Sequence, residues 1–222
     1  MPATETSADT SNKALIITVD GPSASGKSSV ARRVAQVLNL PFVSSGLVYR
    51  GATYQAMRYG VNPDDEGALM SMLEAHPIQL VPNRRGNRLL ADGKDVTEQL
   101  HTREVDALVS AVSRHPKVRG YVYQRVRELS PPFVVEGRDM GRVVFPDAAY
   151  KFYLTARPEV RAHRRSPERD GDLETILAEI IRRDQADIAQ SIPAADAITL
   201  DTSEMSLEEV VNEVISRTRT RQ

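Results

Sequence analysis

Short runs of hydrophobic residues recur along the 222-residue chain, each separated from the next by a helical pattern or a polar loop. The runs are continuous rather than alternating, which is typical of strands that are buried on both faces of a parallel sheet. The segments of this kind are 14–20, 41–44, 133–136, 149–154 and 197–200. Strands that alternate with helices in this way predict an α/β fold.

Two stretches interrupt the alternation. Within residues 62–95, two short apolar runs flank the turn-rich pentapeptide 83–87, which predicts a hairpin in an inserted lobe. Residues 157–190 are dense in arginine and aspartate, and only their middle, 173–181, has an apolar helical face. We expect this second stretch to form a mobile, charged helical lid. Residues 206–209, Ser-Leu-Glu-Glu, form a capping box that predicts the start of a C-terminal helix.

The N-terminal residues 1–13 are rich in threonine, serine, alanine and acidic residues, and they lack the basic start and apolar stretch of a secretory signal. We expect a disordered tail there, followed by a single domain over 14–222. The core of this domain is expected to comprise 14–61, 96–156 and 191–222. No apolar run approaches the roughly 20 residues that cross a bilayer, so we expect a cytoplasmic protein.

The charges of the chain nearly balance, with 29 basic and 30 acidic residues and a net charge of −1 at pH 7. A protein that binds nucleic acid through bulk electrostatics carries an excess of positive charge, so that class is disfavoured. The chain has no cysteine, which excludes a disulfide framework, a thiolate metal site and a cysteine nucleophile. With 41% hydrophobic and 27% charged residues, the composition is that of an ordinary globular domain.

The segment Gly21-Pro-Ser-Ala-Ser-Gly-Lys-Ser28 matches the phosphate-binding loop G-x-x-x-x-G-K-[ST] at every position. Glycines let the backbone curl so that successive N–H groups point at phosphate oxygens, and the following helix adds its positive end. Lys27 supplies a positive charge for the β- and γ-phosphates, and the Ser28 hydroxyl can ligate Mg²⁺. Because an apolar strand precedes the loop and an amphipathic helix follows it, the context supports a nucleoside triphosphate site.

A phosphate-binding loop does not identify the acceptor, since GTPases, transport ATPases and small-molecule kinases all carry one. The sequence has no Asn-Lys-x-Asp segment that would read guanine. Three functions remain open at this point. They are a kinase for a nucleoside monophosphate, a kinase for another small acceptor, and a switch that binds nucleotide without transferring a phosphoryl group.

Four further segments narrow the choice, and they follow the phosphate-binding loop in order. They are Ser44-Ser-Gly-Leu-Val-Tyr-Arg50, Ser110-x-x-Ser-x-x-Pro-x-Val-Arg119, Glu136-Gly-Arg-Asp-Met-Gly141 and Pro193-Ala-Ala-Asp-Ala-Ile-Thr-Leu-Asp-Thr-Ser203. Together with the loop and the hairpin, they make the sequence resemble bacterial cytidylate kinases, which are P-loop nucleoside monophosphate kinases. The resemblance runs from about Leu15 to Ile215.

The resemblance implies a five-stranded parallel sheet wrapped by helices, with an inserted monophosphate-binding lobe and a short helical lid. It implies transfer of the γ-phosphoryl group of ATP to CMP or dCMP, giving CDP or dCDP, with Mg²⁺ as cofactor. We expect a monomer whose partners are these small molecules, without nucleic acid or membrane. The ATP-binding residues would be Gly21, Pro22, Ser23, Ala24, Ser25, Gly26, Lys27, Ser28 and Ser29.

The same resemblance assigns residues on the acceptor side. The implied substrate-binding residues are Ser45, Tyr49 and Arg50 beside the monophosphate, Arg138 with Arg50 at its phosphate, Ser110, Arg119 and Asp139 at the cytosine, and Arg183 and Asp187 near the ribose. Because a carboxylate is unfavourable beside a phosphate, Asp139 and Asp187 fit better as acceptors for base amino and sugar hydroxyl groups.

Phosphoryl transfer of this class depends on positioning and charge neutralisation, and it needs no protein nucleophile. Donor and acceptor together bring several negative charges into one cleft, so cationic side chains must offset them. The catalytic candidates are Lys27, Arg138, Arg161 and Arg165, with Arg164 as a further lid arginine. Ser28 is the candidate metal ligand, and Glu136 could reach Mg²⁺ through water.

Some features depart from the family pattern. Ser44 stands where relatives commonly have an aspartate before Ser-Gly, and Gln190 stands where they usually have an arginine. The lid also looks shortened at 165–172 and at 190–193. The missing lid arginine bears on how tightly the phosphate is clamped, and the neighbouring Arg182 is a candidate to replace it.

Overall fold

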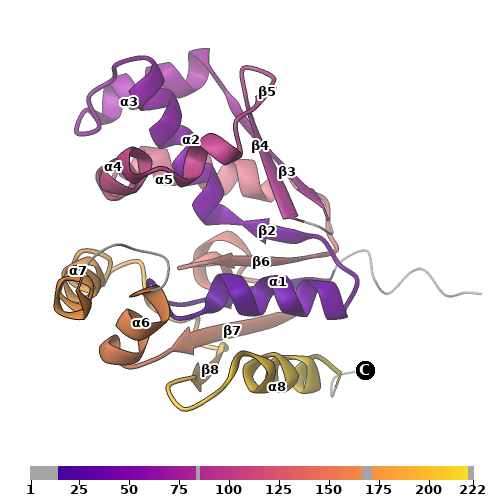
Figure 1. Ribbon diagram of the computed structural model, residues 1–222. Helices are drawn as coiled ribbons and strands as arrows, with labels where there is room; N and C mark the ends of the chain where they lie inside the picture. The colour runs from indigo at the N-terminus through magenta and orange to yellow at the C-terminus, as the bar shows by residue number, and fades with distance from the viewer. Residues whose placement is uncertain (1–14, 84–85, 167–171, 220–222) are drawn as a thin grey trace, which may run out of the picture.

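The computed structural model describes residues 15–83, 86–166 and 172–219, so the predicted N-terminal tail lies outside the described residues. At its centre lies a five-stranded sheet in the order β2-β6-β1-β7-β8, in which neighbouring strands are parallel (Figure 1). The strands are β1 Ile16–Asp20, β2 Phe42–Ser44, β6 Phe133–Gly137, β7 Tyr150–Thr155 and β8 Ile198–Asp201. The five predicted strands and the α/β class are confirmed.

Two helices, α1 (Lys27–Val37) and α8 (Leu207–Arg219), lie side by side along one face of the sheet (Figure 1). Val30 and Val34 of α1 are buried, at the spacing that faces one side of a helix. They share an apolar cluster with Val211 of α8 and with the central strands. Burial of this face therefore fixes the helix that follows the phosphate-binding loop.

The predicted capping box opens α8. The backbone N–H of Ser206 donates to Glu209 Oε2 at 2.8 Å, and the N–H of Glu209 donates to Ser206 Oγ at 3.3 Å. These reciprocal bonds satisfy backbone donors that have no partner inside the helix. The prediction of a C-terminal helix starting at this motif is confirmed.

The chain between β2 and β6 forms a separate layer of helices and a small sheet. Its elements are α2 Ser45–Arg58, α3 Glu66–Ala75, β3 Ile78–Asn83, β4 Gly86–Ala91, β5 Lys94–Asp95, the short 3₁₀ helix η1 Glu98–His101, α4 Arg103–Ser113 and α5 Pro116–Arg127. Strands β3 and β4 are antiparallel, with Asn83 paired to Gly86, so the predicted hairpin is confirmed. One buried cluster joins Leu89 of the hairpin to Val118 of α5. The unit that packs together thus extends beyond 62–95.

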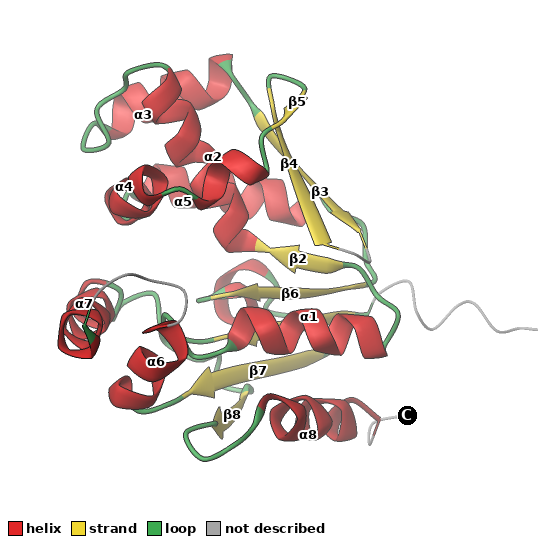
Figure 2. Cartoon of the chain, in the orientation of Figure 1, coloured by secondary structure: helices red, strands yellow, loops and turns green. Residues whose placement is uncertain are grey.

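Two further helices lie beyond the carboxyl ends of the strands (Figure 2). They are α6 Pro158–Arg165 and α7 Leu173–Ala186. They pack on one another through Ala162, Ile176 and Ile180, which confirms the predicted apolar helical face within 173–181. Most of the segment that looked shortened, 165–172, lies outside the described residues.

The register of the large sheet brings three connections to one edge. Asp20 lies opposite Gly137, and Ser44 lies opposite Glu136. Because β1, β2 and β6 are parallel, the chain leaves all three strands at the same edge. The connections are the phosphate-binding loop, the start of α2, and the turn into the π-helix η2 (Met140–Val144). The segments predicted to bind the two nucleotides therefore meet at this edge.

Gly51 lets α2 approach the hairpin closely. A Cβ atom at this position would lie 2.1 Å from Leu89 Cδ2 and 3.3 Å from Ile78 Cδ1, and both of these side chains are buried. We therefore expect Gly51→Ala to overpack this contact and lower the free energy of unfolding by about 1–3 kcal/mol. Urea denaturation measures the change.

The matched control is Gly120→Ala in α5, where an added Cβ meets nothing within 4 Å. This substitution should raise the free energy of unfolding by about 0.5–1 kcal/mol, because alanine favours the helix without creating a clash. If both variants were stabilised to the same extent, the packing argument for Gly51 would be wrong.

Candidate functional site

The phosphate-binding loop has a backbone that depends on glycine at two points. A Cβ atom at Gly21 would lie 2.3 Å from the carbonyl oxygen of Leu154 on the neighbouring strand β7. Gly26 has a φ of 86°, in the left-handed region that favours glycine, and directly precedes α1. The helix therefore begins at Lys27, and its positive end faces the loop.

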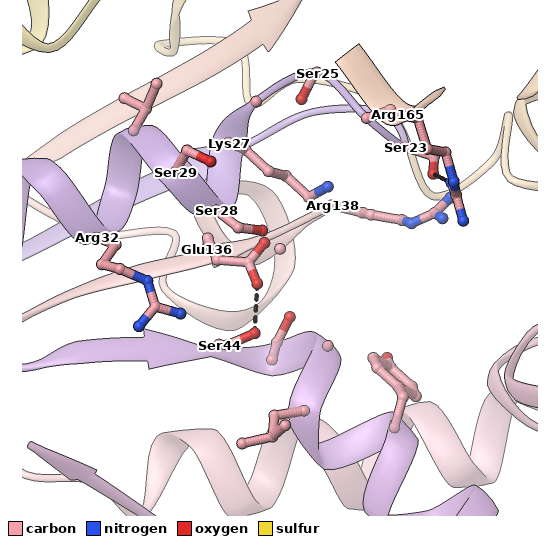
Figure 3. A pocket seen from close by; sticks show the side chains of 18 of the residues that line it. Ser23, Ser25, Lys27, Ser28, Ser29, Arg32, Ser44, Glu136, Arg138 and Arg165 are labelled. Atoms are coloured by element: carbon pink, nitrogen blue, oxygen red, sulfur yellow. Dashed lines mark hydrogen bonds between the residues drawn. The ribbon is translucent and has the colours of Figure 1, made fainter. Parts of the chain in front are cut away.

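Lys27 projects from the start of α1 toward Glu136 and Arg138 (Figure 3). Its Nζ donates to the carbonyl oxygen of Pro22 at 3.2 Å. Loss of water around the ammonium group lowers the pKa of Lys27 to about 8, although the charge of Glu136 opposes the shift. An arriving phosphate would restore the preference for the charged form, which suits a residue that binds anions.

Ser44 contacts the acid at the end of β6. Its Oγ donates to Glu136 Oε1 at 2.5 Å, and the Glu136 side chain is buried (Figure 3). The backbone N–H of Ser44 donates to Asn87 Oδ1 at 3.2 Å, which links the same residue to the hairpin. Ser44, which departs from the family pattern, thus donates a hydrogen bond to Glu136. An ionised aspartate in its place would instead repel the Glu136 carboxylate.

Ser28 and Glu136 both line the cavity near Lys27 (Figure 3). Among the described residues, no group of three or more histidine, cysteine, aspartate or glutamate side chains could hold a metal ion. Mg²⁺ usually keeps several waters and binds through one or two protein oxygens together with substrate phosphates. A hydroxyl and a buried carboxylate therefore fit a Mg²⁺ ion that arrives with a nucleotide.

Asp20, the last residue of β1, is a buried carboxylate that the sequence analysis did not single out. It accepts hydrogen bonds from the backbone N–H groups of Met140 at 2.9 Å and Gly141 at 2.8 Å. Burial raises the pKa of Asp20 to about 7, against the effect of those two bonds. Asp20 thereby ties the strand before the phosphate-binding loop to the turn that carries two predicted substrate-binding residues.

A cavity of about 700 Å³ opens where the loops meet, between the phosphate-binding loop, the start of α2 and helices α6 and α7. The predicted site residues that line it are Ser23, Ala24, Ser25, Gly26, Lys27, Ser28, Ser29, Ser45, Tyr49, Arg50, Arg119, Glu136, Arg138, Asp139, Arg164, Arg165, Arg183 and Asp187. The fold thus gathers predicted site residues that lie up to 164 residues apart in the sequence, from Ser23 to Asp187.

Four predicted residues are not among those that line the cavity: Gly21, Pro22, Ser110 and Arg161. The two loop residues shape the backbone beneath it. Ser110 is exposed on α4, whereas Ser113 on the next turn lines the cavity. The motif contained both serines, and the sequence alone did not indicate which of them faces inward.

The acceptor side of the cavity is crowded with arginines. Arg138 and Arg183 both form ion pairs with Asp187, the second at 3.8 Å. Loss of water, followed by repulsion from Arg138, Arg165 and other arginines, lowers the pKa of Arg183 to about 9. Burial and the charge of a neighbouring arginine likewise lower the pKa of Arg138. The cluster therefore carries more positive charge than the protein itself neutralises.

Arg50 lies on the same side but is held by protein groups. Its Nη1 donates to the carbonyl oxygen of Leu100 at 2.8 Å, and its Nη2 pairs with Asp106 of α4. Both groups belong to the layer that contains the hairpin. Arg50, on α2 of the same layer, thus lines the cavity while η1 and α4 hold its guanidinium.

Asp139 and Arg119 form an ion pair that lines the cavity. Arg119 Nη2 donates to Asp139 Oδ2 at 2.5 Å, and the guanidinium carbon lies 5.6 Å and 5.5 Å from the ring centroids of Tyr49 and Tyr123. The Tyr49 hydroxyl is buried without a hydrogen-bond partner among the described residues, and burial raises its pKa. Sequence reasoning missed Tyr123, whose position four residues after Arg119 on a helix was the available signal.

Arg161 lies in α6 and is held by groups of the protein. We expected a catalytic arginine, but its guanidinium is buried and bonded to protein acceptors, namely the carbonyl oxygens of Ala156 at 2.9 Å and Ser23 at 3.1 Å and the carboxylate of Asp184. With its donors engaged in this way, Arg161 is a structural link between the lid and the loop.

Arg164 and Arg165, the other predicted lid arginines, line the cavity, whereas Arg161 does not. Arg164 donates to Thr202 Oγ1 at 3.0 Å and lines the cavity. Arg165 Nη1 donates to Ser23 Oγ at 2.9 Å, and its side chain reaches the cavity (Figure 3). Arg182, suggested as a replacement for the arginine missing at Gln190, is exposed and does not line the cavity.

The chain is similar to known proteins over most of its length. Residues 17–220 match the family model described as cytidylate kinase. A cytidylate kinase of Thermus thermophilus is 57% identical over 92% of this chain and 98% of its own length. A cytidylate kinase of Deinococcus radiodurans is 50% identical over 90% and 98% of the two chains.

One solved structure shares the fold at low sequence identity. The crystal structure of an uncharacterized protein from Eubacterium ventriosum ATCC 27560 matches with a TM-score of 0.51 and 13% identity, over 91% of this chain and 97% of that chain. Separately, none of the helices in the described part of the chain is long and apolar enough to span a membrane.

The lowered pKa of Lys27 gives a testable pH dependence. Because the folded protein releases this proton near pH 8 and an ordinary lysine keeps it to about pH 10.5, the free energy of unfolding gains a contribution as the pH rises through that window. Lys27→Met removes the ionisable group. We expect wild-type protein to gain on the order of 1 kcal/mol relative to Lys27→Met between pH 7.5 and 9.5.

Urea denaturation at the two pH values measures this difference. Lys94→Met is the control, because Lys94 is exposed and does not line the cavity. If the free energies of unfolding of wild type and Lys27→Met changed in parallel with pH, the lowered pKa of Lys27 would be refuted.

Proposed function

The chain belongs to the cytidylate kinase family, and we propose that it transfers the γ-phosphoryl group of ATP to CMP or dCMP, giving ADP and CDP or dCDP. The observation that carries the proposal is one cavity with a phosphate-binding loop on one wall and the Asp139–Arg119 pair on the other. The first wall suits a triphosphate, and the second suits the hydrogen-bonding edge of a base. Arg138 and Arg183 line the same cavity.

On the donor side, we propose that the loop from Gly21 to Ser29 binds the phosphates of ATP. The N–H groups of the loop and the positive end of α1 would hold the phosphate oxygens. Lys27 would lie at the β- and γ-phosphates, where its ammonium group regains full charge. This assignment follows the position of Lys27 at the cavity wall beside Arg138.

On the acceptor side, we propose that Arg138 and Arg183 bind the phosphate of the monophosphate. Loss of water and then the charge of a neighbouring arginine lower the pKa of each, and a phosphate between them would offset that positive charge. Ser45 and Tyr49 line the same part of the cavity. Asp187 would accept a sugar hydroxyl while it keeps the two arginines in place.

The base would lie against Asp139 and Arg119. Cytosine offers an exocyclic amine as donor and ring acceptors beside it. A carboxylate can accept from that amine, and an arginine can donate to a ring acceptor. The two side chains are already paired with each other, so they present acceptor and donor in a fixed relation.

The reaction itself needs no covalent step with the protein. A phosphate oxygen of the monophosphate attacks the γ-phosphorus of ATP, and the bond to the bridging oxygen of ADP breaks. Lys27, Arg138 and Arg165 would neutralise the charge on the transferring group. The lid helices would exclude water, which otherwise could take the place of the acceptor.

Mg²⁺ would bind through the Ser28 hydroxyl, with Glu136 reaching it through water. When bound, the ion would neutralise charge on the ATP phosphates. Ser44 would orient Glu136 through their hydrogen bond. We propose that the protein acts as a monomer in the cytoplasm.

The proposal is tested by ADP release in a coupled assay with ATP and a panel of CMP, dCMP, UMP and AMP. We expect CMP and dCMP to support the highest kcat/KM. Lys27→Ala should lower turnover by several orders of magnitude, because the charge at the transferring phosphoryl group is lost. Lys94→Ala, at an exposed site away from the cavity, is the control.

A preference for AMP would overturn the cytidylate assignment. Slow hydrolysis of ATP that no monophosphate stimulates would favour a nucleotide switch instead. A rate near that of wild type in Lys27→Ala would contradict the proposed mechanism.

The contrast between two lid arginines gives a separate test. Arg161→Ala removes the donors that reach the half-buried Asp184 carboxylate and the carbonyl oxygen of Ser23, so we expect a loss of about 1–3 kcal/mol in the free energy of unfolding. Arg165→Ala should change stability by less than about 1 kcal/mol but lower kcat more than tenfold, since it removes a charge at the cavity. Equal destabilisation by the two substitutions would contradict the distinction.

A further inference from the structure

We propose that Tyr123 is a positioning residue that gives the site its preference for cytosine over uracil, by fixing the direction of the Asp139 carboxylate. The inference rests on the proposed function, in which Asp139 faces the base. Tyr123 lies on α5 and does not line the cavity. It contacts Asp139 and Arg119, which do line it. Its effect on the substrate would therefore pass through Asp139.

The hydrogen bonds around the Tyr123 hydroxyl determine where its proton lies. Arg119 donates to this oxygen twice, from Nε at 3.0 Å and from Nη2 at 2.8 Å. An arginine has donors but no acceptor, so the tyrosine hydroxyl cannot donate its proton to Arg119. The hydroxyl must then donate to its other neighbour, Asp139 Oδ2, at 2.5 Å.

The two carboxylate oxygens of Asp139 differ in their hydrogen bonds. Oδ2 accepts from both Tyr123 and Arg119, each at 2.5 Å. Within the described part of the chain, Oδ1 has no hydrogen bond to protein, and Asp139 lines the cavity. With Oδ2 held by two donors from α5, the carboxylate cannot turn freely, and Oδ1 is left as an acceptor for a ligand.

An acceptor in a fixed direction distinguishes the two pyrimidines. Cytosine carries an amine at position 4, which donates, whereas uracil carries an oxygen there, which accepts. Two acceptors that face each other repel, and neither is satisfied in a site away from bulk water. Discrimination of this kind depends on the carboxylate being unable to turn away from the uracil oxygen. The Tyr123 hydroxyl supplies one of the two bonds that prevent this turn.

The experiment compares kcat/KM for CMP and UMP in wild-type protein and Tyr123→Phe, which removes a single oxygen. We expect the ratio of CMP to UMP to fall about tenfold or more, because a hydrogen bond to a charged group is lost and Asp139 gains freedom to rotate. An unchanged ratio, even with lower rates for both substrates, would mean that Tyr123 only supports the fold, and it would overturn the inference.

Tyr121→Phe is the matched control. Tyr121 lies on the same helix two residues earlier, and its hydroxyl accepts from the backbone N–H of Ile78 in the hairpin, away from Asp139. The same oxygen is removed from the same kind of side chain. We expect the CMP to UMP ratio to stay as in wild type, and a similar fall in Tyr121→Phe would overturn a specific role for Tyr123.

Two further measurements separate an effect through Asp139 from a general loss of packing. The monophosphate of pyrimidin-2-one riboside lacks the group at position 4, so Tyr123→Phe should leave its kcat/KM within about twofold of wild type. In an Asp139→Asn background, Tyr123→Phe should change the CMP to UMP ratio little, because the carboxylate on which it acts is gone. Full additivity of the two substitutions would overturn the inference.

Failure of this inference and failure of the proposed function give different results. If wild-type protein does not use CMP, the proposed function fails. If wild-type protein prefers CMP and Tyr123→Phe keeps that preference, only the role of Tyr123 fails.

Discussion

Repulsion among like charges is the constraint on which the site depends. Lys27, Arg138 and Arg183 line one cavity, and each has a pKa below its ordinary value because water is partly excluded and other cations are near. Glu136 and Asp187 offset part of this charge. The remaining positive charge makes the cavity attractive to anions such as phosphate groups.

Side chains that repel one another must be attached to something rigid. The parallel sheet supplies this support, since the phosphate-binding loop, the start of α2 and the turn after β6 all leave it at adjacent positions of the register. Asp20 adds two backbone hydrogen bonds between the first and third of these connections. Positions set by strands and by buried hydrogen bonds hold cations closer together than surface loops could.

Local patterns in the sequence predicted much of this structure. The phosphate-binding loop, the five strands, the hairpin and the capping box each depend on residues that are neighbours in the chain, so their spacing was informative. The features that escaped prediction depend on contacts across the fold. Tyr123 donates to Asp139, which is 16 residues away in the sequence, and Asp20 accepts from the turn after β6. For Ser113 and Arg161, the sequence suggested the right segment but could not tell which side of a helix faces the cavity.

The bonds of Arg161 also limit how the lid can move. Its guanidinium holds Asp184 of α7, so α6 and α7 are joined by an ion pair as well as by their apolar contacts. The two helices should therefore swing as one rigid body, with hinges outside them. The same guanidinium, together with Arg165, also binds Ser23 of the phosphate-binding loop. A movement of α6 away from the phosphate-binding loop would therefore break these bonds to Ser23 as well as the bond from Arg164 to Thr202.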